Sequence, residues 1–157
     1  MNKIIILASL VLIFSCKKQE QKEAINIGAV LSMTGKGASV GDYAKKGLEL
    51  AVEEVNNAGG ILGKQVEMYV EDSKSIGKEG VTVTQKLLLS ETPPDLLYVQ
   101  LSSVSLPVKP IAEKNKTIMY GLSGSEKLIE NSEYTFRNWV APWIAGKQLA
   151  NKIEEKF

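Results

Sequence analysis

Apolar and polar positions along this chain alternate between two periods, with short apolar runs separated by amphipathic stretches. Residues 24–31 (AINIGAVL) form a mostly apolar run of strand length, typical of a strand buried in a parallel sheet. Further strands are predicted at residues 65–71, 95–99, 117–120 and 134–137. Apolar spacings of three and four predict helices at residues 41–57, 78–90, 104–115 and 142–157. Because strands and helices alternate, the sequence predicts an α/β fold with a parallel sheet flanked by helices.

The first predicted helix and the strands around it form one βαβ unit. Glycines at 59 and 60 end this helix, because glycine readily adopts the positive φ of a helix terminus. The loop before it lies beyond the carboxyl ends of the strands, where open parallel sheets bind their ligands. Small and apolar residues at helical spacing predict the face of the helix that packs on the sheet: Ala44, Gly47, Leu48, Ala51, Val52 and Val55.

Residues 31–72 also carry a long motif, made of Thr34-Gly35, Gly41, Gly47, Leu50-Ala51, Asn56, Gly59-Gly60-Ile61 and Gly63. This register resembles the opening of the periplasmic amino-acid-binding proteins of ABC transporters, of the branched-chain (Leu/Ile/Val) type. There, a TG-x-x-x-x-x-G loop precedes a helix reading roughly G-x-x-L-A-x-x-x-x-N-x-x-G-G-I-x-G-x-x. The resemblance implies the type I periplasmic binding protein fold, with this chain as the first of its two lobes.

The resemblance covers about residues 25–150 and implies a domain organisation. Residues 24–138 would form the N-terminal ligand-binding lobe, and residues 139–157 the hinge and first helix of a truncated second lobe. Family members are more than twice as long, so we expect a fragment or a truncated reading frame. A naturally short one-lobe protein is the alternative.

The first 23 residues are typical of a targeting segment followed by a tether. Lys3 precedes an eleven-residue apolar run at 4–14, which is shorter than the roughly 20 residues of a membrane-spanning helix. Ser15-Cys16 then resembles a bacterial lipobox, which predicts a lipoprotein signal peptide at 1–15 and lipidation of Cys16, the sole cysteine. Residues 16–23 would be the lipidated cysteine and a polar tether. A plain secretory signal with an incidental cysteine is the alternative.

The segment also predicts where the protein resides. A lipidated Cys16 places it in the periplasm or cell envelope, anchored to a membrane. Lys17 stands where inner-membrane lipoproteins of enteric bacteria carry aspartate, which favours the outer membrane.

Composition argues against several other functions. The net charge is +1 without a basic stripe, so nucleic-acid binding has no electrostatic support. The chain has no histidine, which excludes histidine-based acid–base catalysis and histidine metal ligands. The glycines of residues 35–41 match neither the dinucleotide fingerprint nor the P-loop, and no nucleophile–base constellation is present. We therefore expect no enzyme activity, no cofactor and no metal site.

Small polar loops follow three of the predicted strands, at residues 32–41, 102–103 and 121–125. In a parallel sheet these loops share one edge, where hydroxyls and free N–H groups at helix amino ends suit a carboxylate. Ser102 could equally be a simple helix cap. The convergence of three such loops favours a binding site.

The segment LSSVSLPVKPIAEKNKTIMYGLSGS resembles the family's S-S-x-x-x-x-x-x-P-I-A segment and its A-A-T-type loop. The resemblance implies that Ser102 binds the ligand carboxylate. Leu122 would contact the ligand through its backbone, and Val40 would face the ligand from the first loop. Gly124 stands where the family commonly has threonine, so Ser123 or Ser125 would have to supply that hydroxyl. The predicted ligand-binding residues are Val40, Ser102, Ser103, Leu122, Ser123 and Gly124.

Two further observations concern the loops of the predicted site. The family's glycine before the serine pair is absent, since Gln100-Leu101 stands there. Asp42 and Asp72 are expected to be structural, capping or orienting the loops.

These observations predict a substrate-binding lipoprotein of an ABC uptake transporter. It would hold a branched-chain-type amino acid or a similar small polar solute in an interlobe cleft and deliver it to a membrane permease. One alternative is a sensory or regulatory lipoprotein of the same fold, such as an activator of cell-wall enzymes. The other is a one-domain flavodoxin-like enzyme.

Overall fold

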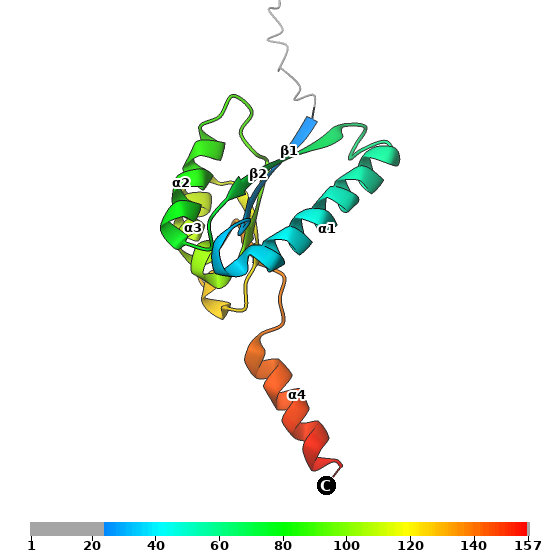
Figure 1. Cartoon of the computed structure of the whole chain (residues 1–157), viewed down its shortest axis with the longest axis vertical. Coiled ribbons are helices and arrows are strands. Elements are labelled where there is room, and N and C mark those ends of the chain that lie inside the picture. Colours follow the sequence, from blue (N-terminus) through cyan, green and yellow to red (C-terminus); the bar gives the residue numbers. More distant parts are fainter. Residues whose placement is uncertain (1–23, 157) are drawn as a thin grey trace, which may run out of the picture.

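The computed structural model describes residues 24–156, in which helices flank a sheet (Figure 1). The sheet has five parallel strands in the order β2-β1-β3-β4-β5. The strands are β1 (Ala24–Leu31), β2 (Gln65–Asp72), β3 (Leu96–Gln100), β4 (Ile118–Leu122) and β5 (Thr135–Arg137). The helices are α1 (Ala38–Asn57), α2 (Gly77–Leu88), α3 (Ser102–Asn115) and α4 (Pro142–Glu154). Two 3₁₀ turns, η1 (Gly35–Gly37) and η2 (Glu126–Leu128), complete the order. The predicted α/β fold with a parallel sheet is confirmed.

Three element boundaries differ from the prediction where the site is concerned. α1 begins at Ala38 instead of residue 41, so Val40 lies in its first turn and not in the loop. α3 begins at Ser102 instead of residue 104, so the serine pair lies inside its first turn. β4 extends to Leu122, because its pairing with β3 continues as far as Gln100. The predicted loop at 121–125 therefore starts within a strand. Serine is not favoured inside helices and glycine is depleted in strands, so apolar periodicity did not reveal these extensions.

The main core lies between the sheet and the pair α2 and α3. Strand residues Val30, Leu97, Val99 and Met119 are fully buried there. Each such side chain contributes about 1.5–3 kcal/mol through removal of apolar surface from water. The opposing residues are Leu87 of α2, Val104, Val108 and Ala112 of α3, and Leu128 of η2.

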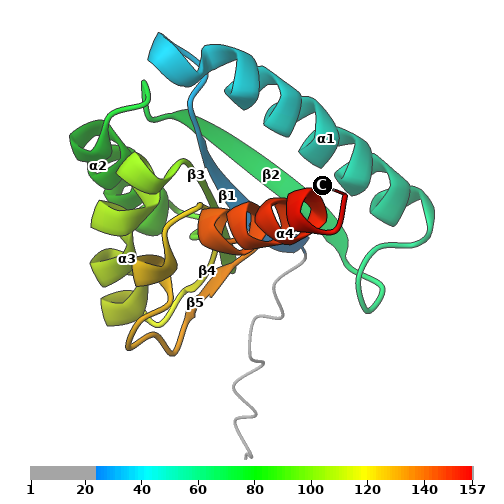
Figure 2. The same cartoon turned by 90° about the horizontal axis from the view of Figure 1, so that it is seen from below.

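The other sheet face is covered only in part. α1 packs on β2 and β1 (Figure 2). Beyond it, the Tyr98 and Tyr120 rings lie 6.1 Å apart between centroids, and Phe136 is 52% exposed. The predicted packing face of α1 is partly wrong, because Gly47 and Ala51 are exposed. The helix meets the sheet along a narrower stripe, which consists of the partly buried residues Ala44, Leu48, Val52 and Val55.

α4 extends away from the carboxyl edge of the sheet (Figure 1). None of its described side chains is buried, and Trp143, Leu149 and Ile153 are each more than half exposed. The helix ends at Glu154, before the predicted end at residue 157. Most of its apolar side chains are therefore exposed, although Trp143 donates a hydrogen bond to Glu126 at 2.6 Å.

Two glycines of α1 provide a direct test of this packing. A Cβ on Gly41 would lie 2.1 Å from the carbonyl oxygen of Ser32, whereas a Cβ on Gly47 would meet nothing within 4 Å. Gly41→Ala should lower the free energy of unfolding by about 1–3 kcal/mol, because the backbone must shift. Gly47→Ala should leave it unchanged or raise it by up to about 1 kcal/mol, since alanine favours the helix. Urea unfolding followed by circular dichroism measures both, and equal effects would contradict the packing.

Candidate functional site

The loop after β1 is held in place by the carboxylate at the end of β2. Asp72 accepts hydrogen bonds from the backbone N–H groups of Met33 at 2.9 Å, Thr34 at 3.2 Å and Lys74 at 2.7 Å. The Thr34 hydroxyl donates to its other oxygen at 2.6 Å. Burial acts to raise the pKa of Asp72, but these hydrogen bonds outweigh it, so that the pKa lies below its ordinary value. The expectation that Asp72 orients a loop agrees with this geometry.

Asp42 has a different role. It accepts a hydrogen bond from Lys46 at 2.7 Å, one turn further along α1, on the exposed side of the helix. Such a pair adds a few tenths of a kcal/mol to a helix. It neither caps α1 nor holds the loop.

A buried amide connects the first loop to the end of β3. Gln100 is fully buried, and its Oε1 accepts from the backbone N–H of Ser32 at 3.3 Å. Its Nε2 donates to the carbonyl oxygen of Val40 at 2.9 Å. This bond fixes the backbone at Val40 relative to the end of β3 and the amino end of α3. Sequence reasoning missed Gln100, although a polar residue closing an apolar strand was an available signal.

The amino end of α3 follows directly. Its N-cap is Leu101, with φ 69° and ψ 137° and no side-chain capping bond. A bulky residue at positive φ is strained, which gives a physical reason for the glycine that the family resemblance leads one to expect here. Ser102 is the first residue of the helix, so the interpretation of Ser102 as a simple cap is wrong. No side chain caps this turn. The N–H of Val104 bonds the carbonyl of Leu101 at 3.1 Å, which leaves the N–H groups of Ser102 and Ser103 for a ligand.

The loop after β4 is joined to α3 through two serine hydroxyls. Ser123 is 2% exposed, and its Oγ donates to the Oγ of Ser102 at 2.9 Å. The backbone N–H of Ser125 in turn donates to Ser123 at 3.2 Å. The Leu122 carbonyl accepts from the N–H of Leu101 at 3.1 Å. The Ser123 hydroxyl is thus engaged with Ser102, while Gly124 lies near Pro142 and Trp139.

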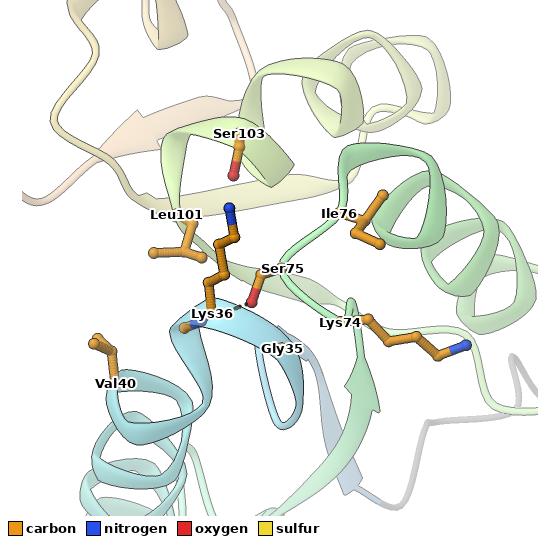
Figure 3. Close-up of a pocket in the computed structure, with 9 residues that line it drawn as sticks. Gly35, Lys36, Val40, Lys74, Ser75, Ile76, Leu101 and Ser103 are labelled. Carbon is orange, nitrogen blue, oxygen red and sulfur yellow. Dashed lines mark hydrogen bonds between the residues drawn. The ribbon is translucent and has the colours of Figure 1, made fainter.

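Three of the six predicted residues line one of two pockets at the carboxyl edge, whereas Ser102, Ser123 and Gly124 line neither. Val40 and Ser103 line a pocket of 680 Å³, and Leu122 lines one of 520 Å³. The hydrogen-bonded pair Ser102 and Ser123 links the segments that line the two. The larger pocket, drawn in Figure 3, is lined by Gly35, Lys36, Gly37, Val40, Lys74, Ser75, Ile76, Leu101 and Ser103. The smaller is lined by Leu122, Asn138, Trp139, Val140, Pro142 and Ala145.

The loop between β2 and α2 is the main part of the site that sequence reasoning missed. Ser75 accepts a hydrogen bond from the N–H of Gly37 at 2.9 Å and donates to the carbonyl of Thr34 at 3.1 Å. Lys74, Ser75 and Ile76 therefore form a wall of the larger pocket. The signal was available, because this loop also follows a strand of the parallel sheet.

The described residues offer no metal site and no membrane span. Among residues 24–156, no group of three or more histidine, cysteine, aspartate or glutamate side chains is placed to hold a metal ion. None of the helices in that range is long and apolar enough to cross a membrane. Cys16 lies outside the described residues, as do the whole predicted signal peptide and tether.

Comparison with known proteins decides the family. A family model described as periplasmic binding protein matches residues 24–156. The chain belongs to this family. Among curated members, it is 33% identical over 95 residues to the Leu/Ile/Val-binding protein BraC3 of Rhizobium johnstonii. The aligned residues make up 60% of this chain and 26% of that protein.

Solved structures of periplasmic binding proteins agree. The branched-chain amino acid transporter substrate-binding protein LivJ from Streptococcus pneumoniae, in complex with isoleucine, superimposes with a TM-score of 0.69. The two chains are 29% identical, and the superposition covers 73% of this chain and 33% of LivJ. An ABC transporter substrate-binding protein from Desulfitobacterium hafniense in complex with Leu gives 0.72 at 26% identity, covering 85% and 39%. The predicted resemblance to branched-chain amino-acid-binding proteins is confirmed, and this chain spans well under half of each relative.

The hydrogen bonds of Asp72 predict an acid-dependent stability of the lobe. Since the folded-state pKa is depressed, their contribution is present above the unfolded pKa of about 4 and is lost as the pH falls through the folded value. Asp72→Asn should therefore lower the melting temperature at pH 7 by about 5 °C and reduce the further loss between pH 5 and pH 3. Thermal unfolding across this pH range measures both effects. Asp42→Asn is the control, and an equal effect from it would contradict the role of Asp72.

Proposed function

We propose that this chain is the first lobe of a substrate-binding protein of an ABC uptake transporter, which takes a small solute through its carboxylate. The observation that carries the proposal is the uncapped amino end of α3, with Ser102 and Ser103 in its first turn. The α3 helix has 14 residues and no acidic residue in that turn. Its aligned peptide dipoles and free N–H groups favour an anion there.

The ligand-binding set follows from the two pockets. The Ser102 hydroxyl would donate a hydrogen bond to the carboxylate, since its oxygen already accepts a hydrogen bond from the Ser123 hydroxyl. Ser103 and Val40 would contact the solute from the larger pocket, and Leu122 from the smaller. Gly124 lies beside Pro142 and Trp139 of the smaller pocket and would contact the solute there. Ser123 would act by orienting Ser102. None of these contacts requires chemistry on the solute, and the chain has no histidine to serve as a base.

The relatives support an amino acid as the solute. The curated ones carry the name Leu/Ile/Val-binding protein, and two solved ones contain isoleucine and Leu. Both of those ligands present an α-carboxylate. The proposal includes a second lobe that closes over the solute, and a membrane permease that receives it. Residues 24–138 would be the first lobe, and residues 139–157 the hinge and first helix of the second.

We also propose that Cys16 is lipidated and anchors the lobe in the cell envelope. The support lies in the sequence, where the sole cysteine follows an eleven-residue apolar run and precedes a charged tether. The outer membrane is the favoured location because Lys17 follows the cysteine. Labelling with a radioactive fatty acid would test the anchor, with Cys16→Ser as the variant that loses the label.

Titration with L-leucine tests the binding proposal. The described lobe covers only one side of a solute, so the expected Kd is on the order of millimolar. Amide chemical shifts of Ser102 and Ser103 should move in a saturable way. Ser102→Ala should weaken binding about tenfold, because a hydrogen bond to a charged group is lost.

The matched control is Ser132→Ala. Its hydroxyl bonds the carbonyls of Leu128 and Glu130, in the loop that enters β5 at the opposite edge. This variant should bind leucine like the parent. Unfolding midpoints of both variants separate lost binding from lost folding. First-turn amides of α3 that stay unshifted up to tens of millimolar leucine would refute the proposal.

A further inference from the structure

The lining of the larger pocket carries positive charge and no negative charge. Lys36 and Lys74 are its only charged residues. The Nζ of Lys74 lies 3.6 Å from the Oε2 of Glu79, and this carboxylate offsets the charge of Lys74. No ion pair involving Lys36 occurs among the described residues. The ammonium group of Lys36 is therefore the uncompensated charge of this pocket.

The backbone that carries Lys36 is fixed on both sides. Gly35 has φ +80° and lies so close to the carbonyl of Lys74 that a Cβ would approach it to 2.5 Å. Gly37 donates its N–H to Ser75. Lys36 thus leaves η1 from a defined position and extends across the pocket, with its ammonium end toward the hydroxyl of Ser103 (Figure 3).

Ser103 belongs to the uncapped first turn of α3, so Lys36 and the helix amino end add their positive potentials at one place. A carboxylate that enters here would meet an ammonium group, a hydroxyl and free N–H groups. An aliphatic side chain would instead desolvate the ammonium without supplying a partner, which is unfavourable. The pocket, at 680 Å³, has room for a solute larger than its carboxylate head group.

We propose that Lys36 is a specificity-determining residue that selects an amino-acid-like solute with a second carboxylate. One carboxylate would lie at Ser102, and the other between Lys36 and Ser103. The inference rests on the proposed function, since it assumes that the solute binds at the amino end of α3. The isoleucine and Leu bound to the two solved relatives have uncharged side chains, whereas the solute proposed here carries a negatively charged one.

L-Glutamate and L-glutamine provide the test, because they have nearly the same shape and differ in one negative charge. The whole chain, purified in mild detergent, is titrated with each of them and with L-leucine, and amide shifts around the larger pocket report binding. Because Lys36 is exposed, glutamate should bind only about fivefold more tightly than glutamine, at the upper end for an exposed ion pair. Salt should reduce this preference. Lys36→Gln should abolish it.

Lys64→Gln is the matched control. It removes the same charge, but Lys64 directly precedes β2, at the opposite edge of the sheet. This variant should keep the preference for glutamate. Binding of leucine without any preference for glutamate, or a preference that persists in Lys36→Gln, would overturn the inference and leave the proposed function standing. Absence of shifts with all three amino acids would overturn both.

Discussion

The buried amide of Gln100 is the interaction on which the carboxyl edge of this lobe depends. Three segments meet there, namely the exit of β1, the start of α1 and the end of β3, and the last lies at least 60 positions from the other two. Each brings backbone groups that lose contact with water and must find partners. Gln100 satisfies the N–H of Ser32 and the carbonyl of Val40 with one side chain. Asp72 does the same for Met33 and Thr34 on the other side of the loop. The pocket walls keep their positions because these polar groups are paired.

This arrangement also accounts for the strained residue beside it. With the Gln100 side chain turned inward, the chain must reverse sharply to begin α3, and Leu101 takes a positive φ to do so. The cost is of the order expected for non-glycine residues in this region, about 1–3 kcal/mol. Strain of this kind persists where surrounding contacts over-determine the backbone. Here they include the bond from the Leu101 N–H to the Leu122 carbonyl. The result is a helix amino end that no side chain caps and that opens onto the site.

Charge is distributed unevenly around this edge. Carboxylates such as Asp72 face the backbone and are saturated by N–H donors, so they do not project into the larger pocket. Lysines line that pocket instead. At this edge, hydrogen-bond donors and ammonium groups are therefore available to a solute, whereas the Asp72 carboxylate is used in hydrogen bonds within the lobe. In contrast, the smaller pocket near α4 is lined by apolar side chains such as Trp139 and Val140, together with Asn138. The two pockets therefore offer different surfaces to the two ends of a solute.

The sequence by itself determined the order of strands and helices, because apolar periodicity and glycine positions are local properties. It also indicated the edge at which binding loops gather, since every strand of a parallel sheet ends there. The motif from Thr34 to Gly63 identified the family, which the comparisons confirmed. Only the tertiary structure decided which loop residues meet. The loop of Lys74 and Ser75, the bridging role of Gln100 and the hydroxyl pair of Ser102 and Ser123 all join residues at least 21 positions apart. The sequence also did not predict that Gly47 and Ala51 of α1 are exposed, because the width of a buried helix face depends on how much of the sheet the helix crosses.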